Sequence, residues 1–346
     1  MQTLIITIFI IIFIMYFYFT KEGFKSNDSN EILLKNYLLN TNNLYGKNRP
    51  NIWIHSIYEI NSRNWTTFQD RNSYNFNQPY IDLSIQTIIE HCSNNFNIFL
   101  INDDSFSKLI PNWKWPNMSI ISEPKKKNIR NYGLLLLIYF YGGIIVPNSF
   151  ICFRNLESLF KPIPFVIETI NHTLFDFNKT FSPSVDFIGI RNKNNPIIKK
   201  YIQDFYPNDF TDNILIKNNK KIHKTFKNDK EDWNFVGIEN DINGKSRNII
   251  QEYVKENNLF MWSGNLFGIK DNNGNPILIE NLMEDNYLDI PNNIYGILID
   301  SQEILRRTKY NWLLYIKPDD NNLLNLNNIL SKYLNKALID GKIINK

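Results

Sequence analysis

Beyond residue 50, short apolar runs alternate with longer amphipathic stretches, which predicts strands and helices in turn. Asn51–Tyr58 (NIWIHSIY) is rich in β-branched and aromatic residues and is typical of a strand. After Pro79, which favours the first turn of a helix, apolar residues recur at helical spacing through residues 80–92. Asn97–Ile101 is a second apolar run of strand length. This order predicts a parallel βαβ unit, whose binding loops lie at the carboxyl ends of its strands.

The next long apolar stretch is Asn128–Tyr141 (NIRNYGLLLLIYFY), which ends at Gly142-Gly143. Glycine is the residue that most often follows the end of a helix, so this stretch predicts a helix. It has almost no polar face and is too short to cross a bilayer. We therefore expect it to be buried in the core of the domain, with a strand at Ile144–Val146 after it.

The rest of the sequence predicts further strands and further helices. It contains no internal repeat. Further strands are expected at Ile120–Ile121, Phe150–Phe153 and Asp186–Ile190. Further helices are expected at Pro196–Phe205, Gln302–Arg307 and Leu323–Leu338. A late hairpin is expected to join Trp262–Lys270 to Pro276–Ile279 through an Asn-Asn-Gly turn. Strands that alternate with helices predict the α/β class.

The N-terminal apolar run has a different character. Leu4–Phe19 contains one polar residue, Thr7. Together with Thr3, its length is at the lower limit of the roughly 17–25 residues that a membrane-spanning helix needs. No basic region precedes it, and no small-residue cleavage site follows, as they would in a signal peptide. We expect an uncleaved anchor. A buried core helix and a signal peptide with a poor cleavage site are the alternatives.

The expected organisation therefore has three parts. Residues 3–20 form a single-pass transmembrane helix, residues 21–47 a polar stalk, and residues 48–346 a globular domain. Lys21 and Lys25 follow the span and Glu22 offsets part of their charge, so the side of the membrane stays open.

Composition narrows the classes of function. A chain of 346 residues with 43% hydrophobic content can bury a large core. Its 38 Lys and Arg against 34 Asp and Glu give a net charge of +4, too near balance for nucleic acid to be the expected partner. Cys92 and Cys152 are the only cysteines and are too few for a four-ligand metal site. We expect them to be two reduced thiols in the core.

Tyr139–Phe150 (YFYGGIIVPNSF) resembles the LLYKYGGIYLDxD segment of glycosyltransferases with the GT-A fold, which include sugar-binding DXD enzymes and capsular-polysaccharide-synthesis proteins. Trp53–Tyr58 and Asn77–Tyr80 are similar in order and spacing to the first βαβ unit of those enzymes, and Asp186–Ile202 to the strand and helix after their sugar site. The likeness covers about Asn51–Asp204 and is strongest to members carried by large DNA viruses. It implies a GT-A-like fold, a mostly parallel sheet flanked by helices.

The same resemblance implies an activity and its partners. It implies transfer of a sugar from a nucleotide-sugar donor to a hydroxyl of a glycan or protein acceptor. The alternative is a catalytically inactive protein of the same fold that binds a glycan or another protein, because a fold alone does not fix function.

The sequence departs from the family pattern where a metal would bind. In the family two carboxylates follow the YGG, since a divalent cation bridges protein oxygens and the nucleotide diphosphate. Here Pro147-Asn148-Ser149 fills that segment, with Pro147 and Ser149 at the carboxylate positions. An Asp and an Arg expected on the preceding helix are replaced by Asn131 and Leu134. The usual metal site is thus absent, and no divalent metal cofactor is expected.

Arginine and lysine can stabilise a leaving diphosphate in place of a metal, because they carry positive charge and several N–H donors. The candidates for contact with the nucleotide and its phosphates are His55, Arg63, Arg71, Lys127, Arg130 and Asn131. Ordinary surface arginines and a strand histidine are the alternative interpretations.

Asp103 and Asp104 follow the second predicted strand and are the catalytic candidates. A carboxylate there can bond a ribose or accept a proton from an acceptor hydroxyl. The alternative is an N-cap for a short helix that starts at Ser105.

Overall fold

The computed structural model describes residues 37–39, 49–56, 79–121, 125–170, 181–205, 249–284, 291–299 and 324–344. The described residues from Leu39 onward belong to one compact unit, Leu39–Lys346. The predicted anchor at residues 3–20, Arg63, Arg71 and the predicted helix Gln302–Arg307 lie outside the described residues. Among the helices that are described, none is long and apolar enough to cross a membrane.

A six-stranded sheet organises the domain in the order β2-β1-β3-β6-β5-β7. β1 runs parallel to β2 and β3, β6 runs antiparallel to β3 and β5, and β7 runs parallel to β5. Five of these six strands therefore share one direction, which confirms a mixed α/β protein with a mostly parallel sheet. The strands are β1 (Asn51–His55), β2 (Asn97–Ile101), β3 (Gly143–Ile145), β5 (Phe165–Ile170), β6 (Phe181–Ile190) and β7 (Phe260–Trp262).

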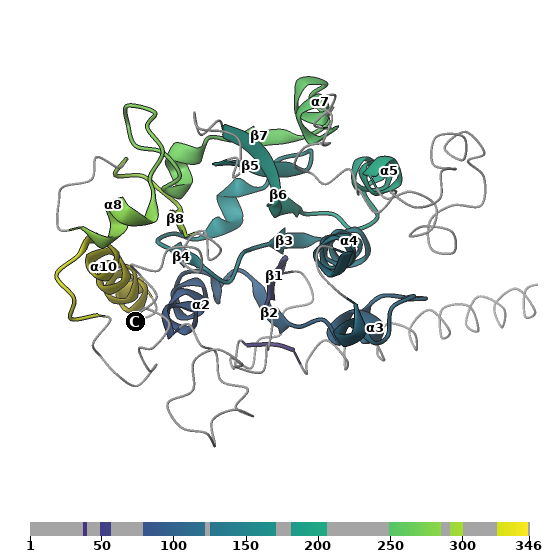
Figure 1. Cartoon of the computed structure of the whole chain (residues 1–346), viewed down its shortest axis with the longest axis horizontal. Helices are drawn as coiled ribbons and strands as arrows, with labels where there is room; N and C mark the ends of the chain where they lie inside the picture. Colours follow the sequence, from purple (N-terminus) through teal and green to yellow (C-terminus); the bar gives the residue numbers. More distant parts are fainter. Residues whose placement is uncertain are drawn as a thin grey trace, which may run out of the picture. The chain divides into compact units, whose positions relative to one another are not determined.

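Helices cover both faces of this sheet, with α4 and α5 on one side and α2 and α10 on the other (Figure 1). A second, two-stranded sheet pairs β4 (Phe150–Cys152) with β8 (Gly296–Leu298) in antiparallel register. The described helices are α2 (Pro79–Cys92), α3 (Ser105–Leu109), α4 (Lys125–Tyr141), α5 (Pro196–Phe205), α7 (Ile249–Lys255), α8 (Ile279–Met283) and α10 (Ile329–Ile344). Short 3₁₀ turns are η2 (Met118–Ile120), η3 (Leu156–Leu159) and η5 (Gly264–Phe267).

Two glycines join α4 to β3. Gly142 and Gly143 have φ values of 68° and 106°, in the region that glycine alone adopts without strain. A side chain at Gly143 would overlap the carbonyl oxygen of Asn51 on β1. The indole N–H of Trp53 donates to the carbonyl of Gly142 at 2.9 Å. The glycines thus let the chain leave α4 and enter the sheet directly beside β1.

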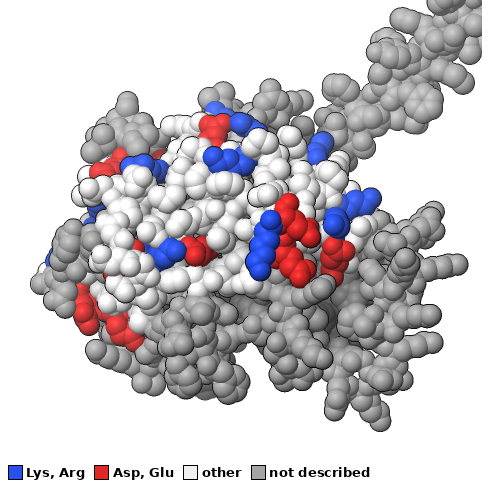
Figure 2. All heavy atoms as spheres, turned by 90° about the horizontal axis from the view of Figure 1, so that it is seen from above, with Lys and Arg blue, Asp and Glu red and all other residues white. Residues whose placement is uncertain are grey.

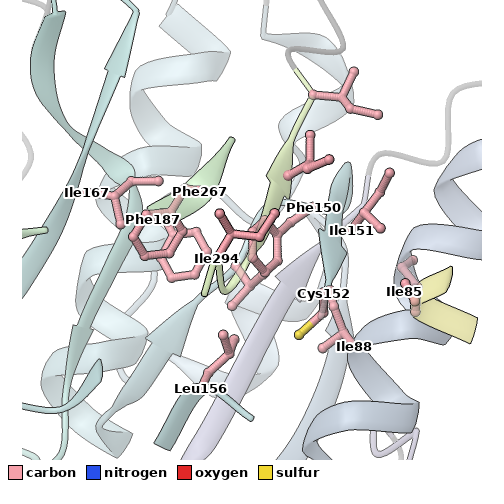
Figure 3. Packing of buried hydrophobic residues seen from close by; sticks show 14 of the residues in the cluster. Ile85, Ile88, Phe150, Ile151, Cys152, Leu156, Ile167, Phe187, Phe267 and Ile294 are labelled. Atoms are coloured by element: carbon pink, nitrogen blue, oxygen red, sulfur yellow. The ribbon is translucent and has the colours of Figure 1, made fainter. Parts of the chain in front are cut away.

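The main hydrophobic core lies on the α2 face of the sheet (Figure 3). Phe150 of β4 packs edge-on against Phe187 of β6, with ring centroids 5.2 Å apart, and Phe187 contacts Phe267 at 5.3 Å. α2 packs against β4, and Figure 3 shows Ile88 of α2 and Cys152 of β4 in this part of the core. The small sheet thus fills the space between α2 and the main sheet.

Charges on the described surface are mixed. Figure 2 shows basic and acidic side chains next to one another on the face that it displays. Arg191 and Glu157 form an exposed ion pair at 2.8 Å, and exposed pairs of this kind contribute little stability, about 0–1 kcal/mol.

Most predicted elements in the first two hundred residues are confirmed. The helix after Pro79, the strand Asn97–Ile101 and the helix Pro196–Phe205 have the predicted bounds to within a residue. α4 starts at Lys125, three residues earlier than expected, and it is buried as predicted. The last helix, predicted at Leu323–Leu338, begins at Ile329 instead.

The strand predicted at Ile120–Ile121 is wrong. The side chain of Asn117 accepts the N–H of Ser119 at 3.2 Å and so starts the 3₁₀ turn η2. Met118 is buried, whereas Ile120 is 80% exposed, so the apolar pair does not face the core together. A local side-chain cap therefore prevails over strand propensity here.

The late hairpin is mostly wrong as well. Trp262 belongs to the edge strand β7 of the main sheet, and the chain then coils into η5. What remains of the hairpin is an isolated bridge between Lys270 and Pro276, with the Asp271 carboxylate accepting two backbone N–H groups of the turn. The turn was predicted in the right place, but the strands on either side of it were not.

Leu136 offers a direct test of the buried helix, because its side chain is fully buried in α4. We expect Leu136→Asp to unfold the domain, since burying an unpaired carboxylate costs several kcal/mol out of a typical total of roughly 5–15 kcal/mol. Ile120→Asp is the matched control at an exposed position and should leave the melting temperature nearly unchanged. Thermal denaturation followed by circular dichroism measures both, and a Leu136→Asp protein that melts like wild type would refute the burial of α4.

His91 predicts a pH dependence of stability. It is 4% exposed, its Nε2 bonds the carbonyl of Ala337 at 2.9 Å, and it thereby joins α2 to α10. Burial lowers the pKa of His91 below the ordinary 6.5, although the Ala337 bond, Asp340 and Glu90 oppose the shift. The unfolded chain therefore binds a proton on His91 more readily than the folded chain does. The free energy of unfolding is thus undiminished by this histidine above about pH 6.5 and decreases as the pH falls below that value. His91→Gln should lose less stability than wild type between pH 7 and pH 5.5 in urea titrations; equal losses would contradict this role.

Candidate functional site

The strand order places a candidate site at the carboxyl end of β1. The chain leaves β1 for β2 on one side and later returns to β3 on the other, so β1 is the switch point of the sheet. In open α/β sheets, ligands bind outside the carboxyl ends of the strands at such a point. His55 is the last residue of β1, Asp103 lies just beyond β2, and Asn148 lies beyond β3. The βαβ rule thus brings three strand ends together.

At this edge, His55, Asp103 and Arg130 form one cluster. The Asp103 carboxylate accepts from Nε and Nη2 of Arg130, each at 2.8 Å, and lies 2.9 Å from Nε2 of His55. The side chains of His55 and Arg130 are 11% and 10% exposed, and that of Asp103 is 21% exposed. The two-point contact with the guanidinium fixes the plane of the carboxylate.

Packing behind the cluster holds the histidine. The His55 ring stacks on Phe106 of α3 at 5.5 Å with an angle of 4° between the planes. Phe106 in turn lies against α4 at Gly133, where a Cβ would come within 2.9 Å of the phenyl ring. Gly133 lies three residues after Arg130 and therefore on the same face of α4. Because glycine has no side chain, Phe106 fits against this face, and the face can lie close to the strand ends.

The loop between β2 and α3 turns Asp103 toward the cluster. The Asn102 N–H donates to Oγ of Ser105, and the Ser105 N–H donates to Oδ1 of Asn102, both at 3.0 Å. Asn102 and Ser105 therefore close the turn that leads into α3. Asp104 occupies the N-cap position but makes no side-chain cap bond, and it is exposed. The alternative of an aspartate side chain as helix cap is thus wrong for Asp104.

The cluster keeps Asp103 ionised. Burial by itself would raise the pKa of Asp103, but the hydrogen bonds from His55 and Arg130 outweigh it and lower the pKa below its ordinary value. An ionised carboxylate can only accept hydrogen bonds. Nε2 of His55 is therefore the protonated ring nitrogen, and Nδ1 is the basic one when the ring is neutral.

The segment after β3 contributes polar contacts rather than carboxylates. Nδ2 of Asn148 donates to Oγ of Ser56 at 3.4 Å, which links the end of β3 to the end of β1. The Ser149 hydroxyl is buried and donates to the carbonyl of Ile299 at 2.6 Å. Pro147 has no side-chain oxygen. Within the described residues, no three His, Cys, Asp or Glu side chains gather into a group that could hold a metal ion.

The structure brings together some of the predicted site residues. His55, Asp103 and Arg130 meet, although they were predicted for two different roles. Asn131 is partly buried on α4, next to Arg130. Arg63, Arg71 and the side chain of Lys127 lie outside the described residues, so their assignment to phosphates stays a prediction.

Sequence reasoning missed Phe106, Asn102 and Gly133, which position the cluster without taking part in its charge. Phe106 and Gly133 carry no chemical signal of their own. A signal did exist for Asn102, because asparagine side chains often bond nearby backbone N–H groups in turns and at the start of helices. The Asp103–Arg130 pair spans 27 residues and is not visible in local spacing.

No family model matches the chain, and no curated protein matches it either. Among solved structures, the chain is similar to one described as "PaToxG Glycosyltransferase", with 19% sequence identity and a TM-score of 0.29. The match covers 54% of this chain and 68% of that one. At this TM-score the similarity is too distant to argue a shared site or activity.

The Asp103–Arg130 pair should matter for stability as well as for the site. Asp103→Ala removes the carboxylate that holds a largely buried guanidinium, and we expect a loss of roughly 3 kcal/mol. Asp104→Ala is the matched control, because Asp104 is exposed and its side chain caps nothing. It should change stability by less than about 0.5 kcal/mol.

Urea unfolding of both variants measures the difference. Equal midpoints for Asp103→Ala and wild type would mean that the cluster is not formed in solution.

Proposed function

We propose that this protein is a GT-A-like, nucleotide-sugar-dependent glycosyltransferase that binds its donor at the carboxyl end of β1 without a divalent metal. The observation that carries the proposal is the His55–Asp103–Arg130 cluster at the switch point of a mostly parallel sheet. The resemblance of the YFYGGIIVPNSF segment to GT-A enzymes supports it, since this segment forms the end of α4, β3 and the start of β4.

The electrostatics of the cluster suggest a different role for each of its three residues. A carboxylate whose pKa is lowered is a weak base, so Asp103 is better suited to orient His55 than to take a proton itself. In this proposal His55 accepts the proton of the acceptor hydroxyl through Nδ1. Asp103 and Arg130 act as positioning residues, and the exposed Asp104 has no part in catalysis.

The negative charge of a bound diphosphate has to be balanced by basic residues outside the His55–Asp103–Arg130 cluster. Arg130 and Asp103 neutralise one another, so the cluster offers little net positive charge. Arg63, Arg71 and Lys127 therefore remain the leading candidates for phosphate contacts, and Asn131 for a neutral hydrogen bond beside them. A guanidinium matches phosphate oxygens in a planar fork, which is why arginine suits a metal-free site.

Contacts after β3 support metal independence. The Ser149 hydroxyl is engaged with the Ile299 carbonyl, and the Pro147 side chain has no ligand atom. Hard divalent cations prefer several oxygen ligands with negative charge among them. The proposal therefore includes no divalent metal cofactor.

The predicted anchor at residues 3–20 would keep the domain at a membrane. The acceptor in the proposal is a glycan or a protein that carries a hydroxyl group, and nucleic acid is not a partner. The side of the membrane stays open.

A catalytically inactive binding protein is the second candidate. The replacement of both family carboxylates by Pro147 and Ser149 favours it, because those carboxylates hold the metal in the enzymes that the segment resembles. Donor binding separates the two candidates.

Titration calorimetry of the full-length protein in detergent, with UDP- and GDP-sugars, tests the proposal. We expect one nucleotide sugar to bind with the same affinity in EDTA and in Mg²⁺. Arg63→Ala and Arg71→Ala should each weaken binding at least about tenfold, because a charge-assisted hydrogen bond contributes roughly 1.5–3 kcal/mol. Asp104→Asn should bind like wild type.

Binding that disappears in EDTA would show that other carboxylates rebuild a metal site. If no nucleotide sugar binds in either condition, the inactive binding protein becomes the better candidate.

A further inference from the structure

The fold brings the two cysteines of the chain into contact. Cys92 is the last residue of α2 and Cys152 the last residue of β4, and both are fully buried. Their sulfur atoms lie 3.9 Å apart, and neither is in a disulfide. The sequence predicted buried reduced thiols but gave no reason to expect that residues sixty positions apart would touch.

Hydrogen bonds hold the two backbones in place around this contact. The Cys152 N–H donates to the hydroxyl oxygen of Thr87 on α2 at 2.8 Å. One turn further along α2, the His91 carbonyl accepts from Nδ2 of Asn155 at 3.3 Å. These bonds hold the backbones of α2 and β4 beside one another, and so keep the two thiols within reach of each other.

We propose that Cys92 and Cys152 are a disulfide-forming pair that links α2 covalently to β4. The co-reactant is a low-molecular-weight disulfide such as glutathione disulfide. One cysteine thiolate attacks it and releases one glutathione, and the second protein thiol then displaces the other glutathione. The S–S bond forms, both protein thiols lose their protons, and one disulfide is reduced to two thiols.

The geometry requires a small movement. A disulfide has a sulfur–sulfur distance of about 2.05 Å, so the sulfurs must approach one another by roughly 2 Å. The Cys152 thiol now donates to the carbonyl of Arg154 at 3.1 Å and would give up that bond.

The pair should react slowly while the protein is folded. The thiolate is the attacking species, and burial together with the neighbouring Cys92 thiol raises the pKa of Cys152. Burial also keeps the oxidant away from both sulfurs. We therefore expect the bond to form during folding, or when the interface between α2 and β4 opens, and to resist reductants once it has formed.

The bond would tie together the part of the chain that builds the site. The segment between the two cysteines contains Asp103, Arg130 and Asn148. Closing a loop of this length restricts the unfolded chain and so stabilises the folded one. Because disulfides persist in oxidising compartments, the state of this pair would also report on which side of the membrane the domain lies.

The chain makes the test simple, because it has two cysteines in total. Full-length protein is unfolded in urea with a reductant, then refolded in detergent with either glutathione disulfide or dithiothreitol. Each sample is alkylated under denaturing conditions, and the mass of the intact chain is measured by mass spectrometry. We expect the oxidised sample to be two hydrogen atoms lighter than the reduced chain and to take up no alkylating reagent.

The oxidised sample should also melt on the order of 5 °C or more above the reduced sample. Cys92→Ala and Cys152→Ala are matched controls in which redox conditions should not move the melting temperature. Two alkylated thiols per chain in the oxidised sample, glutathione adducts without the internal bond, or an oxidised chain that melts no higher than the reduced one would each overturn the proposal. The mass measurement on the wild-type chain decides the matter even if a control variant does not fold.

Discussion

The close approach of α4 and β3 to β1 at Gly142-Gly143 is the constraint on which the rest of the site depends. A side chain at Gly143 would overlap the Asn51 carbonyl, and the Trp53 indole bonds the Gly142 carbonyl in the same place. Because this junction fixes where α4 ends, it also fixes where Arg130 lies, about three helical turns before that end. It sets β3 beside β1 as well, and so brings Asn148 to Ser56. The glycines thus act through geometry and take no part in the chemistry.

The site that results is compact and close to neutral. Arg130 holds Asp103 ionised, Asp103 orients His55, and Phe106 supports the ring from behind. A site of this kind differs from one built around a cation, since its carboxylate is already engaged within the protein. It suits the positioning of a histidine better than the binding of a metal, and it leaves the charge of a diphosphate to other basic residues. This division of roles is the physical basis of the proposed metal-free glycosyltransferase.

The sequence was most informative where local pattern and burial agree. Asn97–Ile101 has four consecutive apolar residues after its asparagine, and the Asn128–Tyr141 helix has a largely apolar surface with a glycine stop, so both were predicted well. The predicted secondary structure was wrong at Ile120, where a cap from Asn117 decides the local structure. The predicted strand pairing was wrong at Trp262, which pairs with β5 almost one hundred residues earlier in the chain. His55, Asp103 and Arg130 were predicted as separate residues, on the first strand, after the second strand and on the helix before Gly142. Their meeting depends on how α4 packs against the sheet, which no local spacing encodes.

The most direct test of the account asks whether a nucleotide binds beside His55. The chain has four histidines, so a spectrum of protein labelled with ¹⁵N and ¹³C in the imidazole rings is simple, and His55→Gln assigns the signal of interest. Titration with UDP and GDP should shift the His55 signals and leave those of His91, which is buried between α2 and α10, in place. If the His55 signals stay unchanged at nucleotide concentrations that saturate binding, the donor does not lie at the carboxyl end of β1, and the central claim is contradicted.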